Sequence, residues 1–377
     1  MSRLLFYAFV GITFFLSGCA SLKTGEAIKQ LRFISAYELS KDYLVDGTLV
    51  GGLSGIDYDS SRGVYYLICD DRSDRSPARF YTAKIFLSAT GIDSVAVVSQ
   101  TPFRMADGGF FPNKNQDPFH VPDPEALRYH PATQQVFWTS EGERLLKGDT
   151  MILNDPTVYV ANLDGTWVDS FSTPDNLRMQ ATQNGPRQNG TFEGLTFTPD
   201  QQSLIVSVEE PIYDDGPRAG LGDSAAWVRF VKFDVNSRKP LAQYAYQIDP
   251  VVLHAQPAGA FKVNGVTDIL AVNDETMLVT ERSYSTGNTG SNIRVYLADM
   301  KKVEPVAATQ NLSQQPPLHS IRKKLLVNMD NLGIFIDNIE GATFGPRLPN
   351  GKRSLIFVAD DNFSSVEVNQ FLLFEVN

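Results

Sequence analysis

Five copies of one short unit, two apolar strands joined by a polar turn, constrain this chain more than any other feature. One copy reads TFEGLTFTPDQQSLIVSVEEP from Thr191, and the other four begin at Leu53, Pro124, Thr267 and Ile339. Apolar residues at every second position predict β-strands. Because the copies recur about every seventy residues along the chain, they predict a repeat architecture rather than a set of unrelated domains.

Each hairpin is followed by further alternating runs, such as RFYTAKIFL and DSVAVVS after the first, so each unit supplies about four short antiparallel strands. This content predicts an all-β fold, a β-propeller of four-stranded antiparallel blades over residues 31–377, with five blades favoured. Six blades would need a degenerate blade hidden in the long insertions, and a pair of two-sheet sandwiches is the competing architecture. The run LRFISAYEL from Leu31 precedes the first unit, and we expect it to close the last blade and cover two sheet edges. The segment from His319 to Leu326 is ambiguous between a strand and a short helix.

The N-terminus predicts export. Residues 1–19 combine Arg3, an apolar run and small residues before Cys19, which is the pattern of a signal peptide and too short for a stable membrane span. The stretch Leu16-Ser17-Gly18-Cys19 resembles a bacterial lipobox, which predicts lipidation of Cys19, and Ala20 resembles the outer-membrane sorting pattern. We therefore expect a lipid-anchored protein of the bacterial cell envelope, on either face of the outer membrane, with residues 20–30 as a tether. The alternative is a plain secretory signal that is cut nearby.

The net charge of −10 argues against nucleic acid and anionic lipid surfaces as partners, because both require a basic surface. Membrane contact is therefore expected through the lipid anchor alone. Cys69 is the one cysteine after residue 19, so the sequence excludes an internal disulfide, and its apolar neighbours predict a buried, inert thiol. No feature of the sequence indicates an oligomer, and we expect a monomer.

Carboxylates mark both open ends of the repeated hairpins. The first strand begins, and the antiparallel second strand ends, at the same edge of a sheet. The resulting pairs are Ser54 with Asp70, Glu125 with Glu141, Glu193 with Glu209, Asp268 with Glu281, and Glu340 with Asp360. Rotational repetition would bring these residues together on one rim of the central channel. Any single acid could equally solvate a strand end, pair with a local arginine or cap a loop.

Clustered carboxylates repel one another unless a cation compensates their charge. Oxygen-rich acidic clusters prefer hard cations, so Ca²⁺ is the expected ion, with Mg²⁺ or Mn²⁺ as alternatives. The chain has four histidines, none in a paired spacing, which argues against a zinc site. The expected metal ligands are Asp70, Asp71, Glu125, Glu141, Glu193, Glu209, Asp268, Glu281, Glu340 and Asp360.

Arginines are threaded into the same loops, among them Arg72, Arg144 and Arg282. A guanidinium beside a metal-binding carboxylate suits phosphate recognition, because the cation neutralises one side of the phosphate and the arginine binds another. The alternative interpretation is that each arginine only neutralises an acidic neighbour.

Several of these motifs resemble the phytase-like β-propeller family that is described as having esterase-like activity. They are SGIDYD, PEALRYHP with WTSEGE, FEGLTFTPD with VSVEEP, and IEGATF with VADDN. The resemblance covers nearly the whole chain after the signal, and it implies hydrolysis of phosphoric esters, with calcium at the propeller mouth as in the related alkaline phytases. Glu125, Glu193 and Glu340 match the family's glutamates, whereas Ser54 and Asp268 depart from the pattern.

We therefore expect metal-assisted attack of water on a phosphorylated small molecule or another phosphoester. Glu193 and Glu125 would be the catalytic carboxylates, and Arg72 and Arg282 would steady the transition state. A covalent serine route is poorly supported, because Ile56 stands where G-x-S-x-G requires its last glycine. The alternative function is a non-catalytic surface lipoprotein that binds a ligand or partner and uses calcium structurally.

Overall fold

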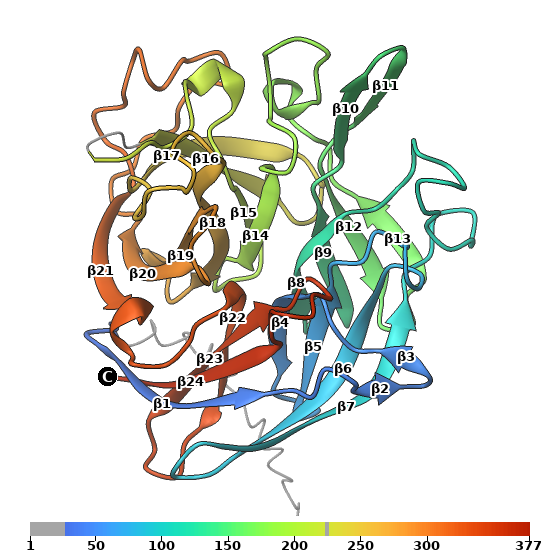
Figure 1. Cartoon of the computed structure of the whole chain (residues 1–377), viewed down its shortest axis with the longest axis vertical. Coiled ribbons are helices and arrows are strands. Elements are labelled where there is room, and N and C mark those ends of the chain that lie inside the picture. Colours follow the sequence, from blue (N-terminus) through green and yellow to red (C-terminus); the bar gives the residue numbers. More distant parts are fainter. Residues whose placement is uncertain (1–26, 223–225) are drawn as a thin grey trace, which may run out of the picture.

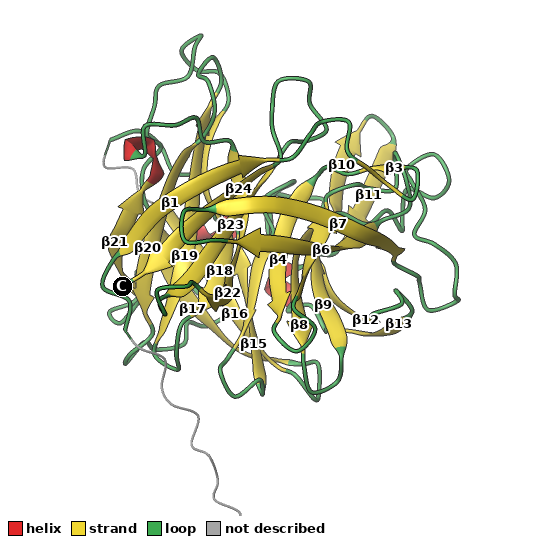
Figure 2. Ribbon diagram, turned by 90° about the horizontal axis from the view of Figure 1, so that it is seen from below, coloured by secondary structure: helices red, strands yellow, loops and turns green. Residues whose placement is uncertain are grey.

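Five four-stranded antiparallel sheets surround one central axis in the computed structural model, which describes residues 27–222 and 226–377 (Figure 1). Nearly all of the regular structure is strand (Figure 2). The chain is therefore an all-β, five-bladed propeller, as the hairpin repeats predict. The expected signal peptide and Cys19 lie outside the described residues.

The blades follow one another along the chain, and the four strands of each blade lie in order from the axis outward. Blade 1 contains β4 (Leu53–Asp59), β5 (Val64–Cys69), β6 (Arg79–Leu87) and β7 (Ile92–Pro102). Blade 2 contains β8 (Pro124–His130), β9 (Gln135–Ser140), β12 (Thr157–Asn162) and β13 (Trp167–Ser170). Blade 3 contains β14 (Phe192–Phe197), β15 (Ser203–Val208), β16 (Ala226–Asp234) and β17 (Pro240–Ile248). Blade 4 contains β18 (Lys262–Ala271), β19 (Thr276–Ser285), β20 (Asn292–Asp299) and β21 (Arg322–Asn328). Blade 5 contains β22 (Asn338–Arg347), β23 (Arg353–Asp360), β24 (Gln370–Val376) and β1 (Leu31–Glu38).

The N-terminal strand closes the propeller, as expected. Strand β1 pairs antiparallel with β24, with Leu31 opposite Val376, and Figure 1 shows the blue strand lying beside the red one near the C-terminus. Of the expected tether, residues 20–26 lie outside the described residues, whereas residues 27–30 lie against the domain. Ile28 is buried, and the backbone N–H groups of Lys29 and Gln30 donate to the carbonyl of Asn377.

The remaining elements are short and lie in the connections. They are the hairpins β2 (Leu44–Val45) with β3 (Thr48–Leu49) and β10 (Glu143–Lys147) with β11 (Thr150–Asn154), and the 3₁₀ turns η1 (Asp175–Leu177), η2 (Tyr213–Asp215) and η3 (Met329–Asn331). The ambiguous segment near His319 forms strand β21 rather than a helix. Its Lys323 turns inward and bonds to Asp249 and Glu281, so a charged residue occupies an inward position of an outer strand.

Apolar side chains fill the space between neighbouring blades. Ile56 and Leu67 of blade 1, for example, share one buried cluster with Val358 and Phe371 of blade 5. The inner strands β4, β8, β14, β18 and β22 contact one another in a closed ring. This packing fixes the ends of the inner strands around a common axis. Among the residues that the structure describes, no helix is long and apolar enough to cross a membrane.

Candidate functional site

The hairpin ends do meet at one end of the channel. In each blade the pairing between the first two strands skips one or two residues, which is a β-bulge; it lies just after the start of the inner strand in blades 1, 2, 3 and 5 and in the middle of β18 in blade 4. A bulge bends a strand and redirects the side chain that it carries. The first residues skipped in blades 1 to 5 are Ser54, Glu125, Glu193, Thr267 and Glu340.

In blades 1, 2, 3 and 5 a small residue follows the bulged residue, because the inner strands approach closely. A Cβ atom on Gly194 would lie 2.6 Å from the Cα of Asp268, and one on Gly341 would lie 2.8 Å from the Cα of Gly55. Real Cβ atoms do not come this close to a neighbouring backbone. The small residue therefore lets the strands close around the axis and brings the glutamates toward one another.

Blade 4 departs from the sequence prediction at both of its positions. The bulged residue is Thr267 rather than Asp268, and Val266 pairs with Glu281, so the next residue outward on β19 is Arg282. Successive residues of a strand face opposite sides, and a shift of one residue reverses each side chain. Blade 4 thus places Thr267 and Arg282 where the other blades place an acid or hydroxyl and a carboxylate.

The two misassigned acids have structural partners instead. Glu281 accepts hydrogen bonds from the hydroxyl of Tyr246 and from Lys323, between blades 3 and 4. Asp268 lies inside the channel, where both of its oxygens accept from Arg128 at 2.9 Å. Asp71 is also displaced from the site, because it caps a loop through the backbone N–H groups of residues 74–76 and pairs with Arg79 at 2.7 Å.

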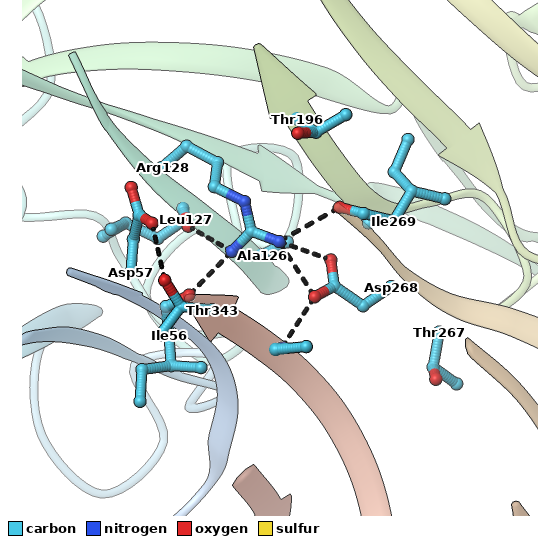
Figure 3. A network of polar contacts seen from close by, with 12 residues as sticks. Ile56, Asp57, Ala126, Leu127, Arg128, Thr196, Thr267, Asp268, Ile269 and Thr343 are labelled. Atoms are coloured by element: carbon cyan, nitrogen blue, oxygen red, sulfur yellow. Dashed lines mark hydrogen bonds and ion pairs between the residues drawn. The ribbon is translucent and has the colours of Figure 1, made fainter. Parts of the chain in front are cut away.

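Arg128 ties the inner strands together in the channel (Figure 3). Besides Asp268, its guanidinium donates to the carbonyls of Ile56, Leu127 and Ile269. Nearby in the channel, Asp57 accepts a hydrogen bond from the hydroxyl of Thr343. It accepts another from the backbone N–H of Tyr129.

A cavity of about 770 Å³ lies at the channel end that holds the bulges. We call the carboxylates that meet there the rim cluster, whose eight members are Asp70, Asp123, Glu125, Glu141, Glu193, Glu209, Glu340 and Asp360. Seven of the ten predicted metal ligands belong to it, and Asp71, Asp268 and Glu281 do not. The predicted Arg72 and Arg282 both line the cavity. Arg144, by contrast, donates to the carbonyls of residues 180–182 in a neighbouring loop.

Sequence reasoning misses Asp123, whose carboxylate lies beside those of Asp70 and Glu125. The signal is its spacing, because Asp123 stands two residues before Glu125, directly before strand β8, and alternate residues of an extended chain share a face.

The two arginines are each shared between carboxylates. Arg282 bonds to Glu209 at 2.8 Å and to Glu340 at 2.5 Å. Arg72 bonds to Glu143 at 2.5 Å and lies 3.4 Å from Asp123. Two guanidinium groups therefore face eight carboxyl groups, and the rim cluster keeps an excess of acid.

Part of the cluster has no partner among the described residues. One buried carboxylate oxygen in each of Asp123, Glu141 and Asp360 accepts no hydrogen bond. Two triads could each hold an ion, because their ligand oxygens lie within 4.8 Å of one another: Asp70 with Asp123 and Glu125, and Glu125 with Glu141 and Glu193. Unpaired, buried carboxylate oxygens in close groups are the donor set that Ca²⁺ prefers, so these residues fit the ion that the sequence implies.

Burial and mutual repulsion raise pKa values across the cluster. Burial, followed by repulsion from neighbouring carboxylates, raises the pKa of Glu125, Glu141 and Glu193 well above the usual range. Burial also raises the pKa of Asp123 and Glu209 to about 7, although Arg72 and Arg282 respectively oppose the shift. The ionised cluster therefore needs additional positive charge.

Fold and site together define a class of protein: a five-bladed propeller with a buried carboxylate cluster that opens into one cavity at the channel mouth. Within that class, the chain belongs to the phytase-like family, described as esterase-like activity of phytase, whose model matches residues 48–363. A search of curated proteins found no match.

Several solved structures resemble the chain at low sequence identity. An α-L-arabinofuranosidase from Lactobacillus brevis is 10% identical, with coverage of 86% of this chain and 91% of that one and a TM-score of 0.44. A protein of unknown function from Dyadobacter fermentans is 8% identical, with coverage of 93% and 100% and a TM-score of 0.41. A periplasmic gluconolactonase of Pseudomonas aeruginosa is 13% identical, with coverage of 92% and 96% and a TM-score of 0.36. At this distance the likenesses carry no argument about activity.

Proposed function

We propose that the protein is a divalent-metal-dependent hydrolase of phosphoric esters that acts in the cavity above the rim cluster. The observation that carries the proposal is that six of the eight rim-cluster residues and two arginines line one open cavity, with buried carboxylate oxygens of the cluster left unpartnered. Membership of the phytase-like family supports the same reaction class.

Calcium would be held by the two triads that share Glu125, with Mg²⁺ or Mn²⁺ as alternatives. When bound, the ion supplies positive charge to the phosphate and lowers the pKa of the water that it binds. The chain's own residues position the ester. Arg282 and Arg72 each direct a guanidinium into the cavity, where they can donate to phosphate oxygens as negative charge moves toward the leaving group.

Glu193 is the residue that we assign as general base. Burial and repulsion from Glu209 and Glu141 raise its pKa, so its carboxylate accepts a proton more readily than an ordinary carboxylate does. Glu125 belongs to both triads and would fix the position of the ions relative to Glu193.

The experiment is a calcium-titrated assay of the purified protein on a phosphomonoester, a phosphodiester and a carboxylic ester. Glu193→Gln is the test variant, and Glu275→Gln, which changes an exposed glutamate paired with Lys301, is the matched control. Calcium-dependent turnover that is lost in the first variant and kept in the second is the expected result. Thermal stabilisation by calcium without turnover of any ester would instead indicate a binding or structural role for the ion.

We also propose that the protein is exported and anchored to the bacterial outer membrane through a lipid on Cys19. The lipobox-like stretch before this cysteine supports the proposal. Mass spectrometry of the N-terminal peptide tests it directly, and Cys19→Ala should move the protein from the membrane fraction to the soluble fraction. An unmodified Cys19 in the membrane fraction would contradict the proposal.

A further inference from the structure

The β18–β19 hairpin of blade 4 extends beyond the rim cluster and forms a wall of the cavity. Past the pair of Gly265 with Arg282, the two strands continue to pair through Asn264 with Ser283, Val263 with Tyr284 and Lys262 with Ser285. In the hairpins of blades 1, 2 and 3, strand pairing stops at the level of the rim acids.

The alternation of side chains along β19 decides which residues of this wall face the cavity. Arg282 and Tyr284 lie on one side of β19 and line the cavity. Glu281 and Ser283 lie on the other side, where they bond to Tyr246 and to the backbone of Val252 in the direction of blade 3. Above Arg282, the wall is therefore aromatic rather than charged.

Apolar side chains from neighbouring loops continue this surface. We call the four exposed apolar residues that line the cavity the apolar lip: Phe261, Tyr284, Phe335 and Val366, whose exposed fractions are 52%, 38%, 45% and 79%. The rings of Phe261 and Tyr284 lie 6.3 Å apart, and Phe335 packs against the loop at Gly290. Exposed apolar groups that gather around a polar cavity are typical of a ligand-binding surface.

The distribution of charge gives the cavity two different halves. Blades 1, 2, 3 and 5 supply the rim cluster, whereas blade 4 supplies Thr267, Arg282 and half of the apolar lip. Arg72 and Arg282 are the cationic residues among the described ones that line the cavity, and each is already shared between carboxylates. A ligand with many phosphate groups would place anionic groups against an apolar wall, without free cations to receive them.

From this arrangement we propose that the cavity selects phosphoric esters whose alcohol portion is apolar, such as an aryl group, and that the apolar lip binds that portion. The inference rests on the proposed function, because the rim cluster must receive the phosphate. The cavity volume of about 770 Å³ leaves room for both parts of such an ester.

The test compares phenylphosphonate with methylphosphonate, two ligands that resist hydrolysis and differ in their organic group. In the presence of calcium, the full-length protein should bind phenylphosphonate roughly tenfold more tightly by calorimetry, because about half of a phenyl surface would be buried. The double variant Phe261→Ser/Phe335→Ser should reduce this preference to about threefold or less. Phe86→Ser changes a residue of blade 1 that is 51% exposed and outside the cavity, and it should leave the preference unchanged.

Equal binding of the two phosphonates overturns the proposal that the apolar lip binds the organic group. A preference for phenylphosphonate that the double variant retains overturns it as well. A preference without hydrolysis of phenyl phosphate leaves the lip supported and contradicts the proposed function. If neither phosphonate binds, the proposed phosphate site fails, and the lip is then tested with the neutral fluorescent probe N-phenyl-1-naphthylamine. Binding of the probe that the double variant loses and Phe86→Ser keeps still supports the lip, and binding that is equal in all three proteins overturns it.

Discussion

Replacing Arg128 with methionine is expected to destabilise the propeller by about 3–5 kcal/mol, because it leaves Asp268 as a buried carboxylate without its cation. The side chains of Arg128 and Asp268 are only 3% and 2% exposed, so water can hardly replace the lost contacts. The substitution also removes hydrogen bonds to the carbonyls of Ile56 and Ile269, which belong to blades 1 and 4. Methionine fills much of the same space, so the loss measures polar contacts more than packing.

Urea unfolding of the purified protein at pH 7 measures this loss, with Arg62→Met as the matched control. Arg62 also pairs with an aspartate, Asp59, but its side chain is 40% exposed, and we expect its removal to cost less than about 1 kcal/mol. The double variant Arg128→Met/Asp268→Asn should lose less stability than the sum of its two single variants, because no unpaired charge remains in the channel. A loss below about 1 kcal/mol for Arg128→Met, or strict additivity in the double variant, would refute the view that this ion pair ties the blades together.

Three further outcomes follow from the site. Without metal, Asp123 and Glu209 have raised pKa values of about 7, so the folded state binds more protons than the unfolded chain between about pH 4 and pH 7, and stability should fall as the pH rises through this window. Thermal melts in a calcium chelator at pH 5 and pH 8 check this, and a higher Tm at pH 8 contradicts it. Arg282→Gln should destabilise the metal-free protein by about 3 kcal/mol, because Glu209 and Glu340 lose their shared cation, and calcium should restore part of the loss; equal Tm values for variant and wild type in chelator would count against it. Gly194→Ala should cost at least about 1–3 kcal/mol in urea unfolding, because its Cβ would lie 2.6 Å from the backbone of Asp268, and a neutral result would show that the inner strands can separate.

The blade count and the closure of the ring could be predicted from sequence because both depend on period-two apolarity. The five hairpins are visible as alternating runs with turns between them, and β1 is visible as a strand without a sequence neighbour. Strand β21 is less clear, because Arg322, Lys323 and Lys324 interrupt the apolar pattern. The structure resolves this with ion pairs from Lys323 that connect distant strands and leave no local signal.

The register of blade 4 could not be predicted from the residues that mark the other blades. Asp268 and Glu281 each lie one residue away from the positions that carry the rim residues in the other blades, so the blade 4 sequence resembles the shared pattern in the wrong register. In the other four blades, a small residue and then an apolar one follow the bulged residue, as in Gly194-Leu195. Blade 4 has Asp268-Ile269 at this place, and because Asp268 is not a small residue, only the strand pairing identifies Thr267 as the bulged residue. The buried pair of Asp268 with Arg128 of blade 2 accommodates the acid at this position, and such a long-range contact leaves no local signal in the sequence.

Consecutive acids at the hairpin ends show how one sequence pattern serves two purposes. In blade 5, Asp360 belongs to the rim cluster, whereas its neighbour Asp361 accepts hydrogen bonds from the backbone of Gly52 at 2.9 Å and from the side chain of Asn369 at 2.8 Å. In blade 1, Asp70 belongs to the cluster and Asp71 fixes its own loop. Because neighbouring residues on an extended chain face opposite sides, one acid of these two doublets can hold the loop in place while the other joins the rim cluster. Asp71 and Asp361 are therefore part of the site's construction although neither lines the cavity, since they fix the strand ends from which Asp70 and Asp360 project.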